Sequence, residues 1–103
     1  MHLRFYIDPE TDSLHIYEHG IEEHEVYEAI LNQYEDIPGK KPIRLLIGLS
    51  DGGRWIRVVY RPEKDGYFVI TAYDLPPKQR KALLRRVRKH WNEKAKVTER
   101  SDS

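Results

Sequence analysis

The sequence of 103 residues contains no cysteine and no long apolar run. The lack of cysteine excludes disulfides, thiolate metal sites and a cysteine nucleophile. No stretch approaches the roughly 20 apolar residues of a membrane-spanning helix, and the N-terminus has no apolar signal-peptide core. Phosphate-binding glycine loops, the dinucleotide fingerprint and the GxSxG motif are also missing, which argues against nucleotide-dependent enzymes and triad hydrolases. We therefore expect one soluble cytoplasmic domain with no cofactor, no nucleotide and no membrane partner.

Charge is distributed unevenly along a chain whose net charge is only +1. Residues 1–37 contain ten acidic residues and a single arginine, whereas residues 38–103 contain seventeen basic and seven acidic residues. Opposite charge in the two halves indicates either a basic surface for a polyanion or two elements that neutralise each other.

Three β-rich runs occupy the middle of the chain, at residues 43–49, 54–61 and 67–73. Their short connections contain glycine, aspartate or proline, so we predict a three-stranded antiparallel meander. Leu3–Ile7 is predicted to add an N-terminal strand. Because side chains alternate along a strand, one face should be apolar and packed against helices. On the second run the apolar face carries Ile56, Val58 and Tyr60. On the third run we expect one face to carry Phe68, Ile70 and Ala72. The opposite face of that run is expected to carry Tyr67, Val69, Thr71 and Tyr73.

Two helices are predicted on either side of the meander. Residues 22–34 combine an apolar stripe with an acidic surface, and residues 78–92 follow two prolines that suit a helix start. The second helix has a narrow apolar stripe that is expected to pack on the sheet, formed by Leu83, Leu84, Val87 and Trp91.

The segments outside these elements are less regular. Leu14–His19 is compatible with a strand or with helical turns, and Gly20 slightly favours a helix that ends there. Asp36–Pro42 is predicted to be a loop because it contains two prolines and a glycine. Residues 93–103 lack apolar periodicity, so we predict a folded domain over residues 1–92 and a disordered C-terminal tail.

Basic side chains dominate the last predicted helix, where seven of the thirteen residues from Lys78 to His90 are cationic and none is acidic. A polyanion would relieve this repulsion through counterion release. The alternatives are a solvated basic face or pairing with the acidic helix. The candidate nucleic-acid-binding cations are Lys78, Arg80, Lys81, Arg85, Arg86, Arg88 and Lys89.

A second candidate surface lies on the middle strand of the meander. Trp55, Arg57 and Arg61 share the face opposite the core, and Tyr73 is available from the neighbouring strand. Arginine forks match phosphate, and flat rings stack on unpaired bases, so this mixture suits single-stranded RNA. Ordinary cross-strand pairing is the alternative.

His15 and His19 are candidate proton-transfer groups because imidazole titrates near neutral pH. Either histidine would act on a ribose 2′-hydroxyl or on a leaving oxygen. Their spacing of four also suits a metal-binding pair on a helix, but the sequence fixes no third ligand, so no metal site is expected. Plain surface or capping histidines remain the other interpretation.

Short motifs along most of the chain resemble the BrnT-like toxins and related toxin-like domains of bacterial type II toxin–antitoxin systems. The matching pieces are Phe5–Pro9, His19–Ile21, Glu25-Val26, Gly48, Gly53-Arg54, Val58–Tyr60, Ile70–Tyr73 and the basic helix. The resemblance implies a RelE-like α+β fold, with a small antiparallel sheet and helices on one face. It also implies metal-independent ribonuclease activity neutralised by a cognate antitoxin. Glu22 replaces a frequent capping serine of these toxins, and Tyr73 stands where the BrnT branch tends to carry arginine.

Three functional hypotheses follow. The first is a toxin-like endoribonuclease for single-stranded RNA. Arg57 and Arg61 hold the phosphate, His15 or His19 moves the proton, and Tyr73 stacks or donates. The second is a non-enzymatic module that binds nucleic acid or an acidic antitoxin segment through the basic helix. The third is a structural relative whose opposite charges neutralise each other.

Overall fold

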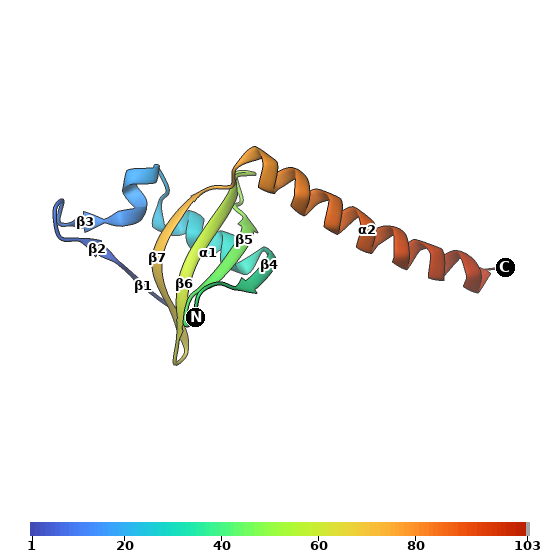
Figure 1. Cartoon of the computed structure of the whole chain (residues 1–103), viewed down its shortest axis with the longest axis horizontal. Helices are drawn as coiled ribbons and strands as arrows, with labels where there is room; N and C mark the ends of the chain where they lie inside the picture. Colours follow the sequence, from blue (N-terminus) through green and yellow to red (C-terminus); the bar gives the residue numbers. More distant parts are fainter. Residues whose placement is uncertain (103) are drawn as a thin grey trace.

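The computed structural model describes the backbone of residues 1–102 and the side chains of residues 1–90. It contains a five-stranded sheet of order β1-β7-β6-β5-β4 and a separate two-stranded ribbon, β2-β3 (Figure 1). The strands are β1 (His2–Phe5), β2 (Ile7–Asp8), β3 (Ser13–Leu14), β4 (Gln33–Pro38), β5 (Arg44–Leu49), β6 (Trp55–Glu63) and β7 (Gly66–Asp74). The helices are the 3₁₀ helix η1 (His15–His19), α1 (Glu23–Leu31) and α2 (Pro77–Asp102). The predicted α+β class is confirmed.

The predicted meander is confirmed, because β5, β6 and β7 pair antiparallel in sequence order. The predicted N-terminal strand is also present as β1. It pairs with β7 in a parallel orientation, so the sheet is mixed and not wholly antiparallel. Strand β1 pairs only with residues 66–69 of β7. The C-terminal half of β7 therefore has no strand partner on the side where β1 lies.

Strand β4 includes residues 36–38 of the loop that was predicted over Asp36–Pro42, whereas residues 39–42 form a turn as predicted. Helix α1 ends at Leu31 and not near residue 34, because Asn32 leaves the helical region with φ −115° and ψ 53°. The chain then runs antiparallel to β5 as the edge strand of the sheet. Proline is tolerated on an edge strand, since one side of its backbone has no ladder partner. Pro38 was therefore a poor guide to the local structure, whereas Pro42 lies in the turn that follows β4.

Helix α1 and η1 cover one face of the sheet, and the main core lies beneath them (Figure 1). Three alternate residues of β6, Ile56, Val58 and Tyr60, are buried there as predicted. Helix α1 lies so close to β5 that a Cβ at Gly48 would overlap the carbonyl group of Ala29. The absence of a side chain at Gly48 is therefore required for this packing.

A β-bulge interrupts the alternation that was predicted for β7. Val59 pairs with Thr71 but Tyr60 pairs with Val69, so Ile70 is the extra residue. Val69 and Ala72 consequently both enter the main core. The prediction that Phe68, Ile70 and Ala72 share a face is wrong for this physical reason. Phe68 instead packs against two cations, with the Arg4 and Arg61 guanidinium carbons 4.8 and 4.9 Å from its ring centroid.

Helix α2 begins on the opposite face of the sheet from α1, which corrects the prediction that the helices pack on one face. Leu83 is buried with Ile47 and Leu75, whereas the neighbouring residue on β5, Leu46, belongs to the core beneath α1. Leu84 was expected in the buried stripe of this helix, but it is 42% exposed.

Beyond this contact α2 points away from the sheet, and its backbone is helical past the predicted end at Asn92 (Figure 1). The side chains of Trp91 and of the tail predicted over residues 93–103 lie outside the described residues. The prediction of a disordered tail stays a prediction. Among the described residues, no helix is long and apolar enough to cross a membrane.

Candidate functional site

Four rings form a continuous row beside the C-terminal half of β7. The centroids of Tyr6 and His15 are 6.1 Å apart, those of His15 and His19 are 5.4 Å apart, and those of His19 and Tyr73 are 5.9 Å apart. The segment left ambiguous by the sequence builds this row, because Leu14 ends β3 and His15–His19 form η1 against β7. Three of the five predicted catalytic residues are thereby brought together: His15, His19 and Tyr73.

The end of η1 is held by Gly20 and Arg54. Gly20 adopts the left-handed conformation, with φ +70°, that favours glycine at a helix C-terminus. The Arg54 guanidinium donates to the Gly20 carbonyl oxygen at 2.9 Å, to both carboxylate oxygens of Asp74 at 2.6 and 3.1 Å, and to Glu25 at 3.2 Å. These contacts raise the pKa of Arg54 and lower the pKa of Asp74. The Gly53-Arg54 motif thus connects η1, α1 and the end of β7.

Arg57 is the Cα partner of Tyr73 on the adjacent strand, but its guanidinium lies near the start of α2. Nη2 donates to Gln79 Oε1 at 3.0 Å, and the residue is only 8% exposed. Nη1 is buried without a hydrogen-bond partner among the described residues. Arg57 lines a pocket of about 350 Å³ together with Glu35, Ile37, Gln79, Ala82 and Arg86.

The other two residues of the predicted strand surface lie apart from the histidines. Arg61 is four residues along β6 from Arg57, about 13 Å at the usual rise of a strand. It contacts the Phe68 ring, with Glu63 at 3.9 Å. Trp55 packs edge-on against Tyr34, with ring centroids 4.9 Å apart. The structure therefore does not gather the predicted arginines and histidines into one compact site.

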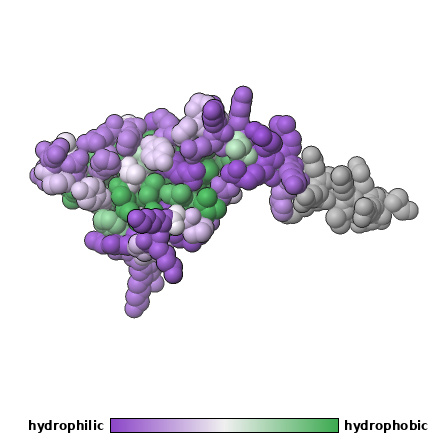
Figure 2. Space-filling view, in the orientation of Figure 1, coloured by the Kyte–Doolittle hydropathy of each residue, from purple (hydrophilic) through white to green (hydrophobic). Residues whose placement is uncertain are grey.

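The described part of α2 is strongly basic and open to solvent. All seven predicted cations are exposed, and Figure 2 shows this segment as predominantly hydrophilic. Arg86 forms a bidentate pair with Glu35, at 2.9 Å for both bonds. No other cation from Lys78 to Lys89 pairs with a carboxylate of the described side chains. Helices α1 and α2 lie on opposite faces, so the acidic helix does not neutralise the basic one within the described part of the chain.

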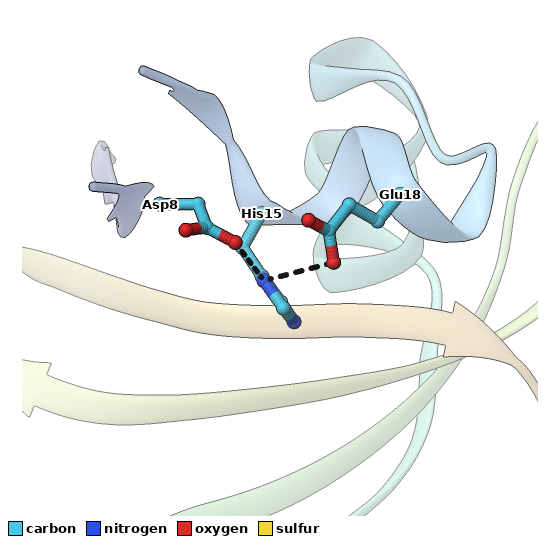
Figure 3. Close-up of side chains that lie close together, drawn as sticks. All are labelled: Asp8, His15 and Glu18. Carbon is cyan, nitrogen blue, oxygen red and sulfur yellow. Dashed lines mark ion pairs between the residues drawn. The ribbon is translucent and has the colours of Figure 1, made fainter. Parts of the chain in front are cut away.

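A further cluster was not found by sequence reasoning. His15 Nδ1 lies 3.5 Å from Asp8 Oδ2 and 3.5 Å from Glu18 Oε2, and the three side chains converge in Figure 3. Glu18 is three residues from His15, a spacing visible in the sequence. Asp8 reaches the cluster only because the β2-β3 ribbon folds back on itself. Nothing local in the sequence signals that approach.

Comparison with protein families gives one match. The family model of DUF4258, a domain of unknown function, matches residues 13–74, and the chain belongs to this family. The matched segment contains η1, α1 and strands β4–β7, whereas α2 lies outside it. No curated protein and no solved structure matches the chain.

Proposed function

We propose that this member of the DUF4258 family is a toxin-like, metal-independent endoribonuclease that holds single-stranded RNA on α2. The observation that carries the proposal is the set of six exposed cations on α2 without a described acidic partner: Lys78, Arg80, Lys81, Arg85, Arg88 and Lys89. Like charges concentrated on one helix repel each other. An RNA backbone relieves this repulsion and releases its own counterions on binding.

The ring row beside β7 supports the cleavage half of the proposal. Metal-independent cleavage of RNA needs a base for the ribose 2′-hydroxyl and an acid for the leaving oxygen. His19 is exposed and lies against Tyr73, so a proton-transfer group and a ring on which a base can stack are adjacent. Arg57 is the Cα partner of Tyr73, but its guanidinium reaches Gln79 at the start of α2, so its charge is not counted in this pair. We assign His19 as the proton-transfer group and Tyr73 as the stacking residue.

A RelE-like relationship and control by a cognate antitoxin belong to the same proposal. A small sheet with helices on it, and motifs that run along most of the chain, support the relationship. An acidic segment of the antitoxin would compete with RNA for α2. We place the protein in the cytoplasm, where both partners are found.

The test is incubation of the purified full chain with fluorescently labelled single-stranded RNA in the presence of a chelator. We expect cleavage by the wild type and loss of cleavage, with RNA binding retained, in His19→Ala. His24→Ala is the matched control, because His24 is exposed on α1 and lies outside the ring row. Absence of cleavage by the wild type, or equal cleavage by His19→Ala, would refute the catalytic assignment.

A non-enzymatic binding module is the second candidate, and the separation of Arg61 from the histidines favours it. The salt dependence of RNA binding tests this function independently of cleavage. For single strands the logarithm of the affinity falls with the logarithm of salt concentration by about 0.7 per neutralised phosphate, so six contacts give a slope of about −4. Replacing Lys81, Arg85 and Arg88 by glutamine should reduce the slope by about 2. A slope near zero in the wild type would exclude RNA binding through α2.

A further inference from the structure

We propose that Asp8, His15 and Glu18 form a binding site for a zinc-type divalent cation. The three ligand atoms all lie within 4.8 Å of one another, and they come from the end of β2 and from η1. Figure 3 shows the imidazole edge of His15 placed between the two carboxylates. The site uses none of the cations of α2 and neither His19 nor Tyr73, and it shares with the ring row only His15, whose ring centroid lies 5.4 Å from that of His19.

The distances fit a shared metal ion better than direct hydrogen bonds. Charge-assisted N–H···O bonds measure about 2.7–2.9 Å, whereas His15 Nδ1 is 3.5 Å from each carboxylate. That nitrogen is inaccessible to solvent and has no hydrogen-bond partner among the described residues. Two ligands, each about 2.1 Å from a tetrahedral zinc ion, are about 3.4 Å apart. Both separations from Nδ1 match this value.

Backbone contacts hold the ligands in this arrangement. The Glu10 N–H donates to Asp8 Oδ1 at 2.9 Å, and the other oxygen, Oδ2, is the one that faces His15. The backbone N–H of His15 donates to the Tyr6 carbonyl oxygen at 3.0 Å and so fixes the start of η1. Bonds of this kind orient ligands in established metal sites.

The chemistry of the donor set selects the class of ion. Two carboxylates and a neutral imidazole carry a formal charge of −2, which a divalent cation cancels. An imidazole ligand favours zinc and its transition-metal neighbours over calcium or magnesium, which prefer oxygen. The ion would join the β2-β3 ribbon to η1. This cross-link should stabilise the folded protein, because a ribbon of two-residue strands outside the main sheet has little stability of its own.

Zinc titration into untagged, chelator-treated full-length protein, followed by calorimetry and by thermal unfolding, tests the proposal. We expect saturable 1:1 binding and a rise in Tm on adding zinc. The near-isosteric variants Asp8→Asn and Glu18→Gln should each weaken binding at least tenfold. Glu10→Gln and His24→Ala should bind as the wild type does, since neither side chain belongs to the cluster.

Two results would overturn the proposal. One is the absence of saturable zinc binding by the folded wild type. The other is unchanged binding by Asp8→Asn and Glu18→Gln with native circular dichroism. Because both readouts are independent of RNA, failure of the ribonuclease proposal would leave the outcome for the metal site unaffected.

Discussion

Replacing Arg54 by alanine is expected to lower the free energy of unfolding by about 2–3 kcal/mol at neutral pH. The guanidinium donates to three groups: the Asp74 carboxylate, the Glu25 carboxylate and the Gly20 carbonyl oxygen. Asp74 is 64% exposed, so its pair contributes at most about 1 kcal/mol. The contacts with Glu25, which is only 16% exposed, and with Gly20 each contribute about 1 kcal/mol net.

The contribution of Asp74 should depend on pH in a definite direction. The hydrogen bond from Arg54 lowers the pKa of Asp74 in the folded protein. A carboxyl with a lowered folded pKa stabilises the protein above its unfolded pKa of about 3.9, and this stabilisation is lost as pH falls through the folded value. The difference in stability between wild type and Arg54→Ala should therefore be full at pH 7 and smaller below about pH 3.9.

Urea unfolding followed by circular dichroism measures both effects, and Arg54→Lys is the matched control. Lysine keeps the charge but lacks the planar fork, so we expect it to recover less than half of the loss. Hydrogen exchange of the Gly20 amide, which donates to Tyr17, should be faster in Arg54→Ala because the end of η1 is released. A stability of Arg54→Ala within 0.5 kcal/mol of the wild type would refute the connecting role of this arginine.

Two further substitutions test the packing. Gly48→Ala should lower the free energy of unfolding in urea by at least about 3 kcal/mol, because the new Cβ overlaps backbone atoms of Ala29. Gly39→Ala is the control, since a Cβ there meets only ordinary contacts. Equal stability of the two variants would contradict the close approach of α1 to β5. Tyr60→Phe should cost about 1–2 kcal/mol, because the hydroxyl donates to the Asp36 carboxylate. Burial and Asp36 raise the pKa of Tyr60, and a hydrogen bond to Glu23 raises the pKa of Tyr17. Ultraviolet titration of Tyr60→Phe should therefore show one fewer tyrosine ionising above the usual range than the wild type does.

Local patterns in the sequence determined the meander, the faces of β6 and the basic character of α2. Hairpins depend on a short connection between two β-rich runs, and alternation within one strand depends only on consecutive residues. For this reason Ile56, Val58 and Tyr60 were placed correctly in the core. The helical end at Gly20 was indicated in the same local way, since a left-handed glycine after a helical turn is a short-range signal.

The tertiary structure decided everything that depends on contacts between distant segments. The edge strand β4 exists because β5 offers it a partner, although Pro38 at its end and the following Gly39 favour a loop. The bulge at Ile70 depends on the register between two strands, and it moved Phe68 away from the core side. The separation of Arg61 from the histidines also follows from register.

The candidate metal site shows the same division. The spacing of three between His15 and Glu18 is visible in the sequence, but it brings the two side chains together only because residues 15–19 form a helix. The third ligand, Asp8, is supplied by a ribbon whose two strands pair over only two residues each. The composition of the sequence determined that α2 is basic. Only the tertiary structure showed that α1 and α2 lie on opposite faces of the sheet, so that the acidic helix does not cover the cations of α2.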